Sequence, residues 1–260
     1  MLPIFLNSTT HASLFVRIIR ITRIILHTLY GVFLSTFILP TVTRRQRNWI
    51  ISYWSRSLLN MMNIQIKIQG TPPNHDLAST MFVGNHISWL DIHVLNSIRA
   101  VRFIAKSEIK SWPIFGWLAQ QTNTLFIERN QKKDAVRVID TAAKSLEKGD
   151  CLCFFPEGTT TDGTELLTFK GSLIQAPINA KAKVWPFVIE YPNKNGSPNK
   201  AMAFAGETTL LESIWQIVSL SKPQATITFL PKISPEGHER RGLTIAVRHA
   251  IATHLNMPHH

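Results

Sequence analysis

The feature that most constrains the fold is a repeated change from a short apolar run to polar and glycine residues. The run that ends at Val83 is followed directly by Gly, Asn and His at 84–86, and the run at 151–155 by Pro-Glu-Gly-Thr at 156–159. Short apolar runs bounded in this way are typical of buried strands. Because the segments between the runs have helical patterns, the sequence predicts an α/β fold with a mostly parallel sheet flanked by helices.

The expected strands and helices alternate from residue 64 onward. Strands are expected at 64–70, 80–83, 101–105, 124–127, 151–155, 184–190 and 225–230, and helices at 89–97, 112–117, 131–148, 210–220 and 239–256. In the helix at 131–148, Val136, Ile139, Ala143 and Leu146 are expected to form the buried face because they recur at helical spacing.

Four of these strands end beside a residue with a polar functional group. The four residues are His86, Lys106, Arg129 and Glu157. The carboxyl ends of parallel strands meet at one rim of a sheet, where the ligands of open α/β sheets bind. The sequence therefore predicts one site at that rim, although plain surface charges would explain Lys106 and Arg129 equally well.

His86 and Asp91 are the residues at this rim that best suit proton transfer. The aspartate follows the histidine by five residues, so its carboxylate can hold one imidazole nitrogen while the other takes a proton from a substrate hydroxyl. A helix-start histidine beside a solvated aspartate would have the same spacing, so the pair alone does not establish a catalytic role. His93, two residues after Asp91, is expected on the surface of the following helix.

Four short blocks together carry a resemblance to a known family. They are Asn85 to Asp91, Phe126 to Arg129, Pro156 to Thr159 and Val184 to Pro186. In their order and spacing, over roughly residues 64 to 231, the sequence resembles the glycerophospholipid acyltransferase family, which includes the 1-acyl-sn-glycerol-3-phosphate acyltransferases. Glu128 stands where many members have aspartate, which keeps the charge.

The resemblance implies direct transfer of a fatty acyl chain from a thioester, either acyl-CoA or acyl carrier protein, to the hydroxyl of a lysophospholipid. It implies that His86 is the general base and that Asp91 orients it. No serine or cysteine stands beside a base in these blocks, so no acyl-enzyme intermediate is expected. Neither a cofactor nor a metal is expected. The residues expected to bind substrate are Lys106, Arg129, Glu157, Gly158, Thr159 and Lys170.

Three functions stay open at this point. The first is acylation of 1-acyl-sn-glycerol-3-phosphate to phosphatidic acid. The second is acylation of lyso-ornithine lipid, because acceptors differ within the family while the blocks stay the same. The third belongs to another class, a non-catalytic basic membrane adaptor that has kept the fold.

The N-terminal part of the chain predicts contact with a membrane. The first acidic residue is Asp76, although the chain has 28 Lys and Arg residues and a formal net charge of +12. Basic and apolar residues without acidic ones suit an anionic membrane surface better than a nucleic acid. The expected partners are therefore membrane lipids and the substrates, and the expected location is the cytoplasmic face of the inner membrane.

The expected division of the chain is a membrane-anchoring helical segment at 1–63 and an acyltransferase domain at 64–260. Residues 24–40 carry no formal charge, but a helix of that length spans about 25 Å, which is short of the roughly 30 Å hydrocarbon core. Basic residues flank both ends. A helical hairpin that enters one leaflet is therefore expected, with a single transmembrane helix as the alternative.

Overall fold

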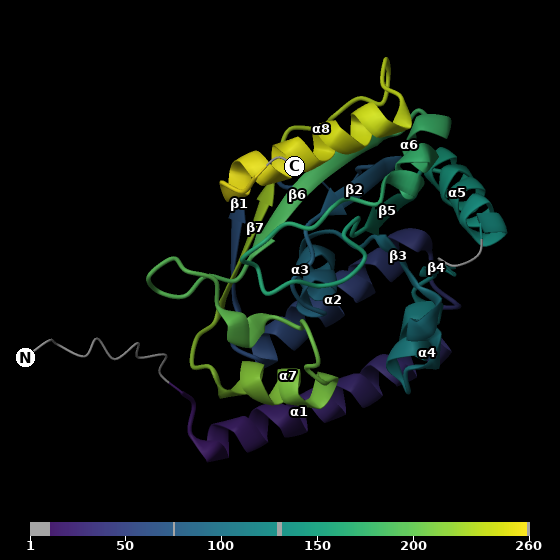
Figure 1. Cartoon of the computed structure of the whole chain (residues 1–260). Coiled ribbons are helices and arrows are strands. Elements are labelled where there is room, and N and C mark those ends of the chain that lie inside the picture. Colours follow the sequence, from purple (N-terminus) through teal and green to yellow (C-terminus); the bar gives the residue numbers. More distant parts are fainter. Residues whose placement is uncertain (1–10, 75, 129–131, 259–260) are drawn as a thin grey trace, which may run out of the picture.

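A seven-stranded sheet forms the middle layer of the structure (Figure 1). The structure is a computed structural model and describes residues 11–74, 76–128 and 132–258. The strand order is β1-β7-β6-β2-β5-β3-β4, and all neighbouring pairs are parallel except β6 and β7. The strands are β1 Gln65–Gln69, β2 Thr80–Gly84, β3 Arg102–Lys106, β4 Leu125–Ile127, β5 Cys151–Phe154, β6 Lys183–Glu190 and β7 Gln224–Phe229.

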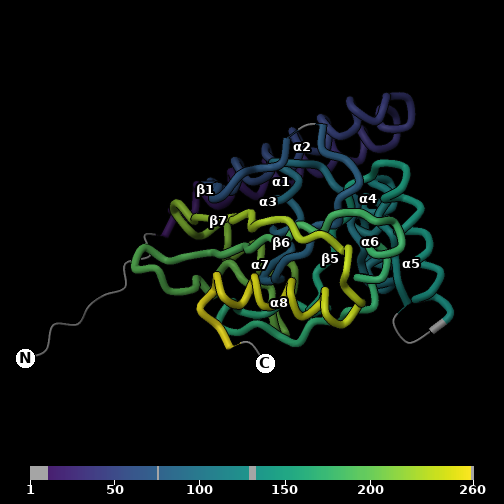
Figure 2. Tube along the Cα trace, turned by 90° about the horizontal axis from the view of Figure 1, so that it is seen from above, coloured from purple at the N-terminus to yellow at the C-terminus, as the bar shows by residue number. Residues whose placement is uncertain are grey.

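Helices cover both faces of this sheet. In Figure 1, α8 lies over β6 on one face, and α1, α2, α3 and α7 lie on the other side. Figure 2 shows β1 and α5 at opposite ends of the molecule, as the strand order requires. The α-helices are α1 Leu14–Phe33, α2 Arg44–Met61, α3 Leu90–Ile98, α4 Phe115–Gln121, α5 Lys132–Glu147, α6 Gln175–Asn179, α7 Leu210–Ser219 and α8 Arg240–Leu255.

Alternating strand residues build a separate core on each face. In β2, Phe82 packs with residues of α2, α3 and α7, whereas Met81 and Val83 pack with residues of α5, α6 and α8. This follows from the two-residue period of a strand, whose successive side chains point to opposite faces. Because both faces are covered, the central strands are apolar throughout.

The fold class predicted from the sequence is confirmed, with several local differences. Ala143 and Leu146 are buried in α5 as expected, but Val136 is 67% exposed, and Val138 and Ala142 complete the buried face. The helix expected from residue 112 begins at Phe115, because the backbone before it turns through a positive φ of 62° at Ile114.

Arg20 attaches α1 to the end of α7. Its guanidinium is buried and donates to the carbonyl oxygens of Val218 (2.8 Å), Leu220 (2.6 Å) and Ser221 (3.1 Å). One turn earlier, the guanidinium of Arg17 lies 5.6 Å from the centre of the Trp215 ring. Two arginines of α1 therefore face the protein, and α1 runs alongside α7 (Figure 1).

The first two helices also pack closely on each other. A π-helical segment, Leu34–Ile38, follows α1, and the chain then returns through α2. The His27 ring stacks on Trp54 with 4.6 Å between centroids. Gly31 is needed at this contact, because an added Cβ would lie 2.7 Å from Trp54 Nε1.

The outer side of this helix pair is apolar and exposed. Leu14–Ile38 is long and apolar enough to cross a membrane by length and composition. Trp49 and Tyr53 stack on each other at the surface of α2, with 5.4 Å between centroids. The large exposed apolar side chains in and beside these and the adjoining helices are Leu14, Phe15, Val16, Ile18, Ile19, Ile25, Leu26, Leu29, Tyr30, Phe33, Phe37, Trp49, Tyr53, Ile114, Phe115, Leu211 and Trp215.

Candidate active site

The Asp91 carboxylate is completely buried in the first turn of α3. Its Oδ2 accepts hydrogen bonds from His86 Nδ1 (2.7 Å), the Ile87 amide (2.8 Å) and the Ser88 amide (3.0 Å). Its Oδ1 accepts one from the Tyr191 hydroxyl (2.7 Å). A buried carboxylate requires such donors, because burial without them costs several kcal/mol.

His86 is held so that one ring nitrogen remains available. Nδ1 bonds Asp91, and the ring stacks parallel to Phe155 with 3.9 Å between centroids and 4° between planes. Nε2 makes no hydrogen bond to any residue that the structure describes, and the side chain lines a cavity. With Nδ1 donating to the carboxylate, Nε2 is the acceptor that can take a proton.

Glu157 fixes the backbone around His86. Its side chain is 3% exposed, and its two oxygens accept the amides of His86 (2.8 Å) and Leu167 (3.0 Å). Burial raises the pKa of Glu157 to about 7, and the two amide donors oppose that shift. The carboxyl group thus connects the loop after β2 with the loop after β5.

Asn85 extends the sheet beyond the end of β2. Its Nδ2 donates to the Ile189 carbonyl (2.9 Å), and its Oδ1 accepts the Ile189 amide (2.8 Å). The side-chain amide of Asn85 therefore makes the two hydrogen bonds to β6 that a backbone peptide group of a neighbouring strand would otherwise make. This pairing aligns the loop that carries His86 with the strand that leads to Tyr191.

A cavity of about 560 Å³ opens beside the His86 ring. Most of its wall is apolar, and it extends from His86 to the N-terminal helices, where Gly31 and Trp54 line it. Glycine is favoured at position 158 because its φ is +76° there.

The structure brings some of the predicted site residues together and leaves others apart. His86, Lys106, Gly158 and Thr159 line the cavity, whereas Glu157 is buried and does not line it. Lys170 is exposed and does not line it. Arg129 lies outside the residues that the structure describes.

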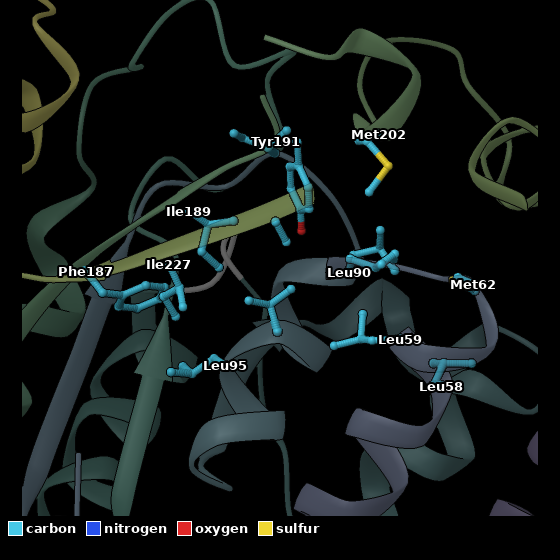
Figure 3. Packing of buried hydrophobic residues seen from close by; sticks show 14 of the residues in the cluster. Leu58, Leu59, Met62, Leu90, Leu95, Phe187, Ile189, Tyr191, Met202 and Ile227 are labelled. Carbon is cyan, nitrogen blue, oxygen red and sulfur yellow. The ribbon is translucent and has the colours of Figure 1, made fainter. Parts of the chain in front are cut away.

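Two residues in or beside this site were not expected from the sequence. Tyr191 follows β6 in the chain, and Figure 3 shows it among the buried residues Leu90, Ile189 and Met202, with its oxygen pointing into the cluster. Burial raises the pKa of Tyr191 well above its usual value, so the hydroxyl stays protonated as a donor. The expectation that His93 lies on the helix surface was wrong, because it lines the cavity.

Comparison with known proteins identifies a shared family. The family described as Acyltransferase matches residues 65–190. A lyso-ornithine lipid O-acyltransferase from Pseudomonas aeruginosa is 31% identical over 207 residues, covering 80% of this chain and 78% of the relative. A 1-acyl-sn-glycerol-3-phosphate acyltransferase from Neisseria meningitidis is 33% identical over 184 residues, covering 71% of each.

A solved structure shares the fold. The crystal structure of the 1-acyl-sn-glycerophosphate acyltransferase PlsC from Thermotoga maritima matches with a TM-score of 0.64 at 20% sequence identity. The match covers 91% of this chain and 96% of that one. It therefore extends beyond residues 64–260 into the N-terminal helical segment.

The raised pKa of Glu157 predicts a pH-dependent contribution to stability. Between pH 4.5 and about 7 the unfolded glutamate loses its proton while the folded one keeps it, so this residue makes the free energy of unfolding fall as the pH rises. Each unit of pKa difference corresponds to about 1.4 kcal/mol. Glu157→Gln cannot ionise, so the wild type should lose stability relative to this variant across that range.

Urea unfolding at a series of pH values measures this difference. Glu236→Gln, which changes an exposed glutamate that is not among the charges acting on Glu157, is the matched control and should leave the pH dependence unchanged. A constant difference between the wild type and Glu157→Gln from acid to neutral pH would contradict the raised pKa.

Proposed function

Because the chain belongs to the glycerophospholipid acyltransferase family, we propose that it transfers a fatty acyl chain from a thioester to the free hydroxyl of a lysophospholipid. The acceptor we propose is 1-acyl-sn-glycerol-3-phosphate, and the product is phosphatidic acid. The observation that carries this proposal is the His86–Asp91 pair, held at 2.7 Å with its free nitrogen beside a long apolar cavity. An adaptor without catalysis would not need a buried carboxylate to orient that ring.

The chemistry is direct acyl transfer. His86 Nε2 takes the proton of the acceptor hydroxyl while its oxygen attacks the thioester carbonyl carbon. The new ester C–O bond forms, the C–S bond breaks, and the proton passes from the imidazolium to the departing thiolate. Asp91 stabilises the imidazolium, and Tyr191 and the two amides hold Asp91 in place.

The cavity suits the hydrocarbon part of the substrate. It reaches from the reacting nitrogen of His86 to the π-helical segment after α1, where Leu34 and Leu39 line it. Burying the chain there removes apolar surface from water, which contributes about 0.8 kcal/mol per methylene. Lys106, which lines the same cavity, is positioned to meet a negative group of the substrate.

The head group of the acceptor decides between two related activities. Arg129 and Lys106 suit a phosphate, because a guanidinium can form two parallel bonds to phosphate oxygens and an ammonium adds a point charge. Acylation of lyso-ornithine lipid is the second candidate, and the 31% identity to the Pseudomonas aeruginosa enzyme with that name favours it. Either donor, acyl-CoA or acyl carrier protein, is acidic and suits the net charge of +12.

We place the enzyme on the cytoplasmic face of the membrane, with residues 1–63 as its anchor. Arg20 fixes α1 along α7, so α1 could not cross the bilayer without carrying the side of the acyltransferase domain with it. A helix that lies in the interface with its apolar side in one leaflet avoids that problem. The cytoplasmic face follows from the donors, because acyl-CoA and acyl carrier protein are cytoplasmic.

Loss of the base should stop the chemistry without unfolding the protein. His86→Ala is expected to lower kcat by about 10²-fold or more, the usual effect of removing a general base. Product formation is measured with acyl-CoA and with 1-acyl-sn-glycerol-3-phosphate or lyso-ornithine lipid as acceptor. His238→Ala, a histidine outside the site, is the matched control. Near-native turnover of a folded His86→Ala protein would refute the mechanism, and a higher kcat/KM for lyso-ornithine lipid would change the assigned acceptor.

Tyr191 should act through Asp91 and not on substrate. Tyr191→Phe removes one donor to a buried carboxylate, a bond worth roughly 1.5–3 kcal/mol, and we expect kcat to fall about tenfold or more with little change in acceptor KM. In an Asp91→Asn background the same change should cost much less, because the charge it supports is absent. Tyr53→Phe, at the surface of α2, is the control. A full additional loss in the Asp91→Asn background would exclude this positioning role.

The membrane arrangement can be tested by labelling single cysteines in sealed vesicles. His11→Cys and Thr41→Cys lie on either side of the apolar segment, and Asn195→Cys lies on an exposed loop of the acyltransferase domain. An interfacial anchor leaves all three accessible to an impermeant maleimide from one side, while buried Cys151 and Cys153 stay unlabelled. Labelling of Thr41→Cys only from the side opposite Asn195→Cys would establish a transmembrane helix.

A further inference from the structure

His93 is a polar group in the cavity that acyl transfer to a simple lipid does not use. It lies on α3, with its ring 5.5 Å from Trp54 and 5.8 Å from Trp89 by centroids. Nδ1 is buried without a partner, and Nε2 makes no hydrogen bond to any residue in the described part of the chain. Burial lowers the pKa of His93 to about 4, so the ring is neutral near pH 7. A neutral imidazole has one donor and one acceptor to satisfy.

Two further polar side chains face the same cavity. Asn96 lies three residues after His93 and thus on the same side of α3. Its Oδ1 accepts the Val101 amide at 3.1 Å, and its Nδ2 finds no acceptor among residues 11–74, 76–128 and 132–258. Ser55 lies on α2, which packs against α3, and both Ser55 and Asn96 line the cavity. We call His93, Asn96 and Ser55 the polar belt.

Binding an unsubstituted hydrocarbon chain beside the polar belt costs free energy. A chain that fills the cavity displaces the water that would otherwise satisfy these groups. Leaving a buried polar group without a partner costs about 1–3 kcal/mol. A hydroxyl on the chain can instead donate to one imidazole nitrogen and accept from the Asn96 amide, which restores both bonds.

We propose that the cavity selects a transferred acyl chain that carries a hydroxyl group, with His93 and Asn96 as its hydrogen-bond partners. This rests on the proposed acyl transfer and adds a substrate class to it. The hydroxyl in question lies within the hydrocarbon chain and is separate from the acceptor hydroxyl that His86 deprotonates. The preferred position of this hydroxyl along the acyl chain is set by the depth at which His93 lies in the cavity. One positional isomer should therefore be preferred over the others.

The test compares hexadecanoyl-CoA with a series of hydroxyhexadecanoyl-CoA positional isomers as donors to a fixed, unsubstituted lysophospholipid acceptor. The wild type is expected to show about tenfold or higher kcat/KM for one isomer than for the unsubstituted chain, which corresponds to one regained hydrogen bond. His93→Phe keeps an aromatic ring but has no ring nitrogen. It should lose the preference for the hydroxylated chain.

Two further variants separate hydrogen bonding from shape and folding. His93→Gln keeps a donor and an acceptor and should retain part of the preference. Ile92→Val changes the volume of a neighbouring cavity residue without changing its polarity, so it should leave the preference intact. Thermal melting of each variant shows that it is folded.

The outcomes distinguish this proposal from the underlying function. Equal kcat/KM for all isomers in the wild type, or an unchanged preference in folded His93→Phe, would overturn hydroxyl recognition while leaving acyl transfer established. A preference seen only when the hydroxyl is on the acceptor's chain would also overturn it, because the cavity would then hold the acceptor. Absence of transfer from every donor would instead refute the proposed function itself.

Discussion

The Asp91 carboxylate is the group around which the site is built. It is fully buried and has four donors, three of which come from residues 86–88 and one from Tyr191. A charge in this position is tolerated only when its donors are in place, since an unpaired buried charge costs several kcal/mol. The same bonds that satisfy the carboxylate therefore fix the loop and the imidazole. The geometry of the proposed catalytic pair and the local stability therefore depend on the same set of hydrogen bonds.

The sheet order supplies the fourth donor. β2 and β6 are far apart in the sequence but adjacent in the sheet, and Asn85 continues their pairing by bonding both backbone groups of Ile189. Tyr191 lies two residues further along and thus reaches Asp91.

Local patterns in the sequence predicted most of the strands and helices, together with the contact between His86 and Asp91, whose catalytic role stays a prediction. These features were accessible because they depend on residues within a few positions of one another. Tyr191 and His93 were missed for a physical reason. The role of Tyr191 comes from the non-local pairing of β2 and β6, which no spacing in the sequence reveals. His93 looks like a surface residue of α3 until α2 is placed against that helix.

The packing of α2 also changes how the first 63 residues relate to the rest of the chain. Leu58, Leu59 and Met62 are buried in the same cluster as Leu90 and Leu95 of α3 (Figure 3), and Trp54 lines the cavity that reaches His86. A detachable anchor would leave the active site complete without it. Here its removal would expose the α3 side of the core and open one wall of the cavity. The segment that we place in the membrane thus also forms part of the cavity beside His86, which suits the proposed transfer of an acyl chain from a membrane lipid environment.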